Sequence, residues 1–129
     1  MNRRPLFGRI EALRAYDDEA AFPRLLPLLA LTDAEFRARY RGTPVLRAKS
    51  WGFQRNACVA LGNLGDPAAI PALAAVLHDS ARHPIVREHA AWALARFSNS
   101  EATHALERAW PDAEGALRDE VALALARAA

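Results

Sequence analysis

The sequence contains a single cysteine and no apolar run long enough to cross a membrane. One cysteine cannot form an internal disulfide, and no cysteine pair is present to build a metal site. The apolar run Leu25 to Leu31 is seven residues long and contains Pro27, whereas a membrane-spanning helix needs about 18 residues. Because no signal peptide follows Met1, we expect a soluble cytoplasmic protein with Cys58 as a buried core thiol.

Residues that favour strands are scarce, while alanine, leucine and arginine dominate. Alanine and unbranched side chains lose little conformational freedom in a helix, so this composition favours helices. The content of 52% hydrophobic and 25% charged residues is that of a globular chain rather than a disordered one. A chain of 129 residues has the length of one domain.

Three segments of the sequence resemble one another. Phe53, Val86 and Leu117 begin them at offsets of 33 and 31 residues, and an Ala-Leu pair recurs later in each at the same offsets. A repeat of roughly 32 residues suits two short helices and two turns. The three segments are therefore interpreted as the inner helices of successive helix pairs.

The segment that begins at Val86 shows the pattern of a buried helix face. Apolar residues recur at spacings of three and four, which places them on one side of a helix; they are Val86, Ala90, Ala93, Leu94 and Phe97. The predicted fold is an all-α, HEAT-like helical repeat stack, or α-α superhelix, forming a single domain over residues 1–129. Its expected parts are an irregular helical segment (1–50), two repeats (about 51–83 and 84–115) and a capping helix (116–129).

Turn signals are expected between the repeat helices. Asp66 followed by proline predicts a helix N-cap, and Ser98 with Glu101 fits a capping box. Gly62 and Gly65 are interpreted as a C-cap turn. Gly52 is expected to mark a bend before the first repeat helix.

Positive charge is concentrated in one part of the chain. The net charge is only +2, but residues 36–65 contain six cations and no acid, whereas residues 66–129 contain six cations and nine acids. Six neighbouring cations repel one another unless a polyanion is close, so this segment is a candidate nucleic-acid site. The alternative is a solvated basic surface.

The candidate contacts follow from this segment. Arginine's planar guanidinium suits phosphate, and an exposed tryptophan can stack on an unpaired base. The candidate phosphate contacts are Arg47, Lys49 and Arg55, with Arg37, Arg39 and Arg41 as weaker candidates. Trp51 is the candidate stacking residue. Phe53 shares its place in the repeat with Val86 and Leu117, so it is predicted to lie in the core.

No catalytic constellation is present. The histidines His78, His83, His89 and His104 are not arranged with a nucleophile and an acid, and no cysteine pair supports a metal site. Each histidine is interpreted as a structural or surface residue. The candidate catalytic and metal sets are therefore empty.

Three runs resemble the C-terminal region of tRNA epoxyqueuosine reductases. They are Gly52-Phe53-x-Arg55-Asn56-x-Cys58-Val59-Ala60-Leu61-Gly62-Asn63 and Val86-Arg87-Glu88-His89-Ala90-Ala91-Trp92-Ala93-Leu94, preceded by Phe36-x3-Tyr40-x-Gly42-Thr43-Pro44-Val45-x-Arg47-Ala48-Lys49. The resemblance covers about residues 20–97.

The resemblance implies a role in queuosine biosynthesis. Enzymes of that family reduce epoxyqueuosine at the tRNA wobble position, using cobalamin and two 4Fe-4S clusters, and their C-terminal HEAT-like region helps to hold the tRNA. One cysteine cannot ligate two clusters, and the cobalamin domain has no counterpart in this sequence. The resemblance thus implies a tRNA-binding module that contacts the anticodon arm and is not catalytic alone. The alternatives are a HEAT-repeat scaffold that holds a protein partner in its groove and, more weakly, a relative of HEAT-like DNA glycosylases.

Overall fold

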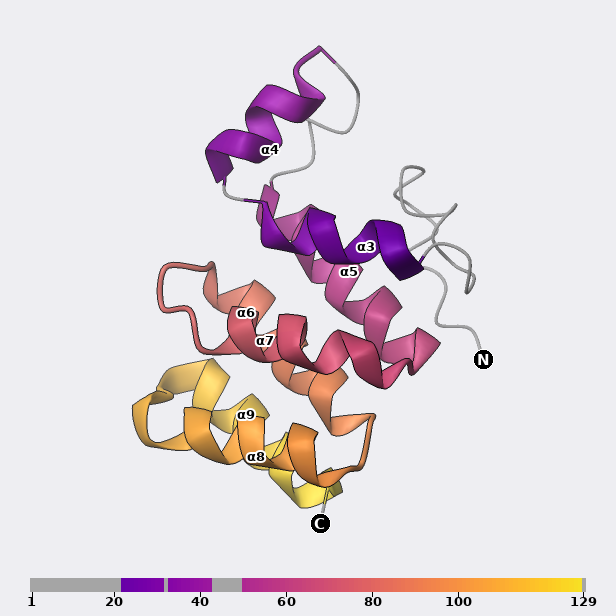
Figure 1. Cartoon of the computed structure of the whole chain (residues 1–129). Helices are drawn as coiled ribbons and strands as arrows, with labels where there is room; N and C mark the ends of the chain where they lie inside the picture. Colours follow the sequence, from indigo (N-terminus) through magenta and orange to yellow (C-terminus); the bar gives the residue numbers. More distant parts are fainter. Residues whose placement is uncertain (1–21, 32, 43–49, 129) are drawn as a thin grey trace, which may run out of the picture.

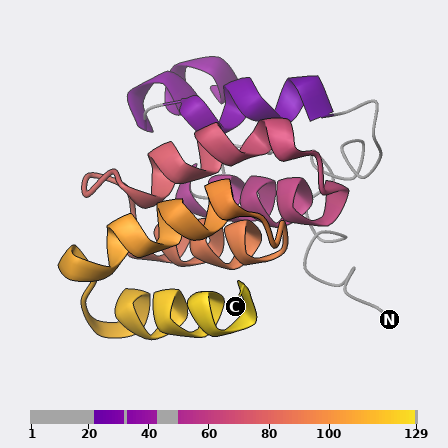
Figure 2. The same cartoon turned by 60° about the horizontal axis from the view of Figure 1, so that its bottom comes forward.

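The protein is a stack of helices. The computed structural model describes residues 22–31, 33–42 and 50–128, and these ranges contain helices and no strand, which confirms the all-α fold class. The elements are α3 (Phe22–Ala30), α4 (Asp33–Tyr40), α5 (Ser50–Leu64), the short 3₁₀ turn η3 (Pro67–Ala69), α6 (Ile70–Leu77), α7 (Pro84–Ala95), α8 (Ser100–Ala109), η4 (Trp110–Asp112) and α9 (Gly115–Ala128). Figures 1 and 2 show them stacked in chain order, from the indigo α3 and α4 to the yellow α9.

The stack has two layers of helices. An inner layer consists of α5, α7 and α9, the three segments that the repeat predicted, each packed on the next. An outer layer consists of α3, α6 and α8, and each outer helix packs on the inner helix that follows it in the repeat. Helix α4 belongs to neither layer: it follows α3 in the chain and packs against α5 (Figure 1).

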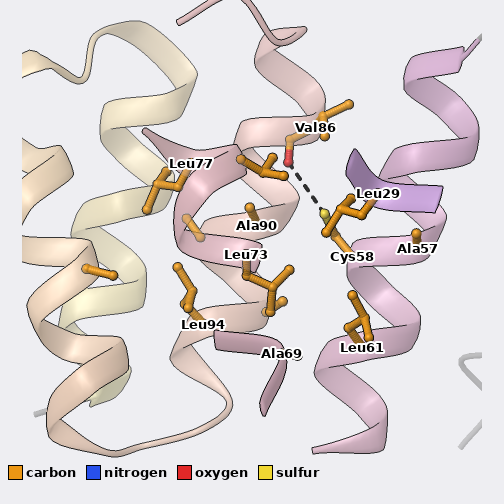
Figure 3. Packing of buried hydrophobic residues seen from close by; sticks show 14 of the residues in the cluster. Leu29, Ala57, Cys58, Leu61, Ala69, Leu73, Leu77, Val86, Ala90 and Leu94 are labelled. Atoms are coloured by element: carbon orange, nitrogen blue, oxygen red, sulfur yellow. Dashed lines mark hydrogen bonds between the residues drawn. The ribbon is translucent and has the colours of Figure 1, made fainter. Parts of the chain in front are cut away.

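One continuous apolar core fills the space between the layers. Leu73 and Leu77 from α6 face Val86, Ala90 and Leu94 from α7 (Figure 3), and all five side chains are buried. Alanine has a small side chain, so alanines at the crossings let the helices approach closely. Close approach increases the dispersion contacts between them. The stripe predicted from the repeat therefore forms the core.

Cys58 lies in this core, as the sequence predicted. It is fully buried, and its thiol points to the carbonyl oxygen of Val86 in α7, 3.9 Å from the sulfur (Figure 3). Burial raises the pKa of the Cys58 thiol to about 12. A thiol held in its protonated form is a poor nucleophile, so Cys58 has a packing role.

The predicted turn residues are only partly confirmed. Asp66 caps η3, since its Oδ1 accepts a hydrogen bond from the Ala68 N–H at 2.9 Å. Gly65 has φ +72° directly after α5 and ends that helix. Gly62, however, lies within α5 and contacts α7 rather than forming a C-cap turn. Gly52 also lies within α5, so the expected bend there is wrong.

The capping box predicted for α8 is wrong, because the helix is capped one residue later and by a single side chain. The N-cap is Asn99, whose Oδ1 accepts a hydrogen bond from the Ala102 N–H at 2.9 Å. Ser98 instead has φ +50°, a left-handed conformation. Its place after α7 corresponds to that of Gly65 after α5, at the same offset of 33 residues. The same helix-ending turn is thus made by glycine once and by serine once.

We expect Ser98→Gly to stabilise the protein by about 0.5–1 kcal/mol. A left-handed backbone conformation costs a residue other than glycine about 1–2 kcal/mol, and the substitution removes this cost. Part of the gain is lost because glycine makes the unfolded chain more flexible, which favours unfolding. The measurement is urea denaturation followed by circular dichroism. Gly65→Ser is the reciprocal control and should destabilise; a loss of stability in Ser98→Gly would contradict the assignment.

Candidate nucleic-acid interface

The predicted phosphate contacts fall on α4, on α5 and on the chain between them. Arg37 and Arg39 lie on α4 and Arg41 directly follows it, and all three side chains are exposed. Arg55 is half-buried on α5. Arg47 and Lys49 lie outside the described residues. The described candidates therefore share one end of the stack (Figure 1).

Helix α4 is an insertion between an outer and an inner helix. The chain between those two helices spans residues 31–49 in the first pair, but only 78–83 in the second and 110–114 in the third. In repeat proteins, insertions of this kind gather on one face, which is often the binding face. The three exposed arginines thus belong to the one connection that departs from the repeat.

Aromatic packing attaches α4 to the stack. The ring of Phe36 lies 5.0 Å from that of Tyr40 and 5.3 Å from that of Phe53, and Tyr40 lies 5.6 Å from Phe53, measured between centroids. Phe36 and Phe53 are each 1% exposed, which confirms Phe53 as a core residue. These contacts give a helix of only eight residues a fixed place, since such a helix is marginal alone.

Trp51 is half-buried at the start of α5 and already has aromatic and cationic neighbours. Its ring stacks on that of His83, with centroids 4.7 Å apart and planes at 21°. The guanidinium carbon of Arg55 lies 5.6 Å from the Trp51 centroid. The Arg55 Nε also donates to the Oδ1 of buried Asn56 at 3.3 Å. The structure therefore brings two predicted site residues, Trp51 and Arg55, together.

His83 is a further member of this cluster that was not among the residues predicted for the site. His83 is the exposed N-cap of α7, and its Nδ1 accepts a hydrogen bond from the Ile85 N–H at 3.1 Å. The repeat alignment contained the signal, because it places Pro84 opposite Trp51 and so sets His83 beside that position on the neighbouring helix.

Four arginines in the second half of the chain have structural partners. Their side chains donate to backbone carbonyls at or near the ends of other helical segments, which lack intrahelical partners. The bonds run from Arg82 to Leu29 (2.8 Å), from Arg87 to Leu77 (2.9 Å), from Arg96 to Gly62 (3.3 Å) and from Arg118 to Trp110 (3.3 Å). These cations therefore serve the stack itself.

One repeat position accounts for two of those bonds. Gln54, Arg87 and Arg118 occupy equivalent places near the starts of α5, α7 and α9, and each donates to a carbonyl at the end of its own outer helix or just beyond it. The Gln54 bond, to the carbonyl of Leu31, is 2.7 Å long. This recurring contact fastens each helix pair.

The charge of the inner helices changes sign along the stack. The position of Arg55 in α5 is occupied by Glu88 in α7 and by Asp119 in α9. Glu120 adds a further carboxyl on α9, and burial raises its pKa above the ordinary value. Acidic side chains therefore replace Arg55 at the equivalent positions, so this repeat position favours a polyanion only at α5.

The described residues offer no metal site. Within the ranges that the structure covers, no group of three His, Cys, Asp or Glu side chains is placed to hold a metal ion. The helices in those ranges are also too short or too polar to span a membrane. The chemistry that this arrangement supports is electrostatic and stacking contact with an anionic, aromatic ligand.

Comparison with known proteins defines the class. The family model of HEAT repeats matches residues 43–126, and the chain belongs to this family. Within it, the chain is similar to epoxyqueuosine reductases. It is 34% identical to that of Bacillus subtilis over 93 residues, which are 72% of this chain and 24% of the enzyme.

Solved structures agree with this placement. A crystal structure of epoxyqueuosine reductase with an epoxyqueuosine-modified tRNA-Tyr stem loop matches with a TM-score of 0.73 and 28% identity, covering 81% of this chain and 28% of that one. Human deoxyhypusine hydroxylase matches with a TM-score of 0.60 and 27% identity, covering 99% and 44%. The chain spans about a quarter of the length of the curated reductases it matches. The cofactor-binding catalytic domains of those enzymes are not in it.

Proposed function

We propose that this chain binds the anticodon arm of tRNA and acts in the cytoplasm as the tRNA-holding module of a queuosine-modifying enzyme. The phosphate backbone would contact the inserted helix α4 and the start of α5. Reduction of epoxyqueuosine would require the catalytic parts that the matched reductases possess, so the chain alone is not expected to be an enzyme. This module is similar in sequence and in structure to the corresponding part of a reductase solved with a tRNA stem loop.

The observation that carries the proposal is the placement of the arginines. Arg37, Arg39 and Arg41 are exposed on and beside the inserted helix, whereas Arg82, Arg87, Arg96 and Arg118 donate to backbone carbonyls. Four arginines of the second half thus contribute to the packing of the stack, while the insertion presents three exposed guanidinium groups close together in the sequence. A bidentate guanidinium on the surface is suited to phosphate.

We expect Arg39→Glu combined with Arg41→Glu to weaken binding to a labelled tRNA anticodon stem loop at least tenfold. Two lost phosphate contacts should also reduce the slope of log affinity against log salt by about two units. Fluorescence anisotropy at several salt concentrations measures both quantities. Reversal of Arg47 and Lys49 to glutamate is expected to act in the same direction.

A matched control separates the site from net charge. Arg108 and Arg127 are also exposed, but they lie on α8 and α9, and reversing both changes the net charge equally. We expect less than about a twofold effect from that double variant. Equal losses in the two double variants, or no loss from the α4 variant, would refute an interface at α4.

A protein partner is the second candidate. Leu123 on α9 is 48% exposed, and it is the large hydrophobic side chain that the described surface presents most openly. A protein partner would be expected to dock on the inner layer at this far end of the stack, where Leu123 could contact it. Such binding would show only shallow salt dependence, whereas nucleic-acid binding is lost steeply.

A further inference from the structure

The rings of Trp51 and His83 form a stacked pair that is partly exposed. Trp51 is covered by His83 and lies beside Arg55, so it is half-buried. His83 has Trp51 against one side and is exposed. The more exposed ring of this pair is therefore the imidazole, and the indole lies behind it.

Capping alone does not require a ring at this position. The cap contact of His83 is one accepted hydrogen bond, from the Ile85 N–H. Asp66 and Asn99 make the same kind of contact at η3 and α8 with small side chains. Asparagine and aspartate are at least as suitable as N-caps. The planar ring of His83 therefore adds stacking area that the helix start does not need.

The charge around the stack selects the kind of ligand. Arg55 lies beside the Trp51 ring and is held there by Asn56, and cations on α4 belong to the same end of the molecule. The equivalent positions on α7 and α9 are Glu88 and Asp119, so the positive environment ends at this helix pair. A ligand with a flat aromatic group and an attached anion fits this arrangement. A nucleotide with an unpaired base has both of these parts.

We propose that His83 stacks on one unpaired base of the bound RNA, with Trp51 behind it and Arg55 beside the adjoining phosphate. This inference rests on the proposed function and refines it: the site would take a single-stranded loop in preference to a duplex, in which bases are already stacked on one another. His83 would then be a specificity residue, while the arginines of α4 supply affinity without regard to base pairing.

The test uses two substitutions that separate the ring from the cap. His83→Asn keeps a capping acceptor and removes the ring, whereas His83→Phe keeps a ring and removes the acceptor. The full chain is titrated by anisotropy with a labelled RNA hairpin that has an unpaired loop and with a blunt duplex of the same stem. Thermal melting of each variant reports the loss of the cap.

We expect His83→Asn to bind the hairpin about 5- to 10-fold more weakly, as the loss of one base–aromatic stack implies, with duplex binding and melting temperature unchanged. His83→Phe should bind the hairpin within about twofold of the unsubstituted chain and melt a few degrees lower. A purely structural residue would give the opposite order of binding.

Three results would overturn the inference. The first is a hairpin affinity for His83→Asn equal to that of the unsubstituted chain, and the second is an equal loss for hairpin and duplex. The third is a loss in His83→Phe as large as in His83→Asn. In each of these cases the chain still binds RNA, so the proposed function survives. If the unsubstituted chain binds neither RNA, the proposed function fails and the inference fails with it.

Discussion

Gly62→Ala is expected to lower the free energy of unfolding by about 2–3 kcal/mol, although alanine is the better helix former. A Cβ at Gly62 would lie 3.0 Å from the Cβ and 3.1 Å from the Cα of Ala93, and 3.1 Å from Cζ3 of Trp92. Neither a backbone atom nor a packed indole ring moves easily, so α5 and α7 would have to separate. That overpacking exceeds the gain of about 1 kcal/mol from helix propensity.

Gly52→Ala is the matched control within the same helix. No described atom lies within 4 Å of the position that its Cβ would take, so only the propensity gain remains, and we expect stabilisation by about 0.5–1 kcal/mol. Urea denaturation of both variants provides the comparison. Stabilisation by Gly62→Ala would show that the two helices can move apart without cost.

Leu94→Ala is expected to cost about 3–4 kcal/mol, because it leaves a cavity at the centre of the stack. Leu94 is fully buried in α7, the helix that packs against α5, α6, α8 and α9 (Figure 3). The surrounding backbone is held from several sides and can collapse into the space only slightly. Urea denaturation measures the loss as a lower midpoint, with the dependence of the unfolding free energy on urea concentration unchanged.

Leu125→Ala makes the same truncation at the equivalent place in the last repeat. Leu125 is only partly buried, and α9 is covered on one side, so the expected loss is below about 1.5 kcal/mol. Similar losses for the two leucines would mean that the repeats do not differ in packing. A larger loss at Leu125 would contradict the central role of α7.

The repeat predicted the inner helices well because the buried side chains of a helix recur at regular spacings in the sequence. Leu61 and Leu94, found from the recurring Ala-Leu pairs, are each 0% exposed. The C-cap turn predicted at Gly62 is wrong for a physical reason: a glycine at a helix end and a glycine at a helix crossing look alike in one sequence. Only the position of Ala93 and Trp92 on the neighbouring helix distinguishes them.

The candidate site was predictable in its charge and not in its geometry. The run of cations is visible in the sequence, and it drew attention to Trp51 and Arg55. The stacking of Trp51 on His83 joins residues 32 positions apart, so no local pattern reveals it. Likewise, the structural use of Arg82, Arg87 and Arg96 depends on carbonyls of distant helices, which only the three-dimensional structure identifies.

The bond from Gln54 to the carbonyl of Leu31 closes the two ends of the α4 insertion at 2.7 Å. It is the first member of the series that continues with Arg87 and Arg118. This bond joins the end of α3 to α5. The length and composition of the chain between the two helices can therefore change while the helices keep their register. The connection between α3 and α5 is therefore a place where the stack can accept insertions. Small insertions and deletions there can change the exposed side of α4 while the register of the helix pair is kept, as long as the contact of Phe36 with Phe53 is preserved.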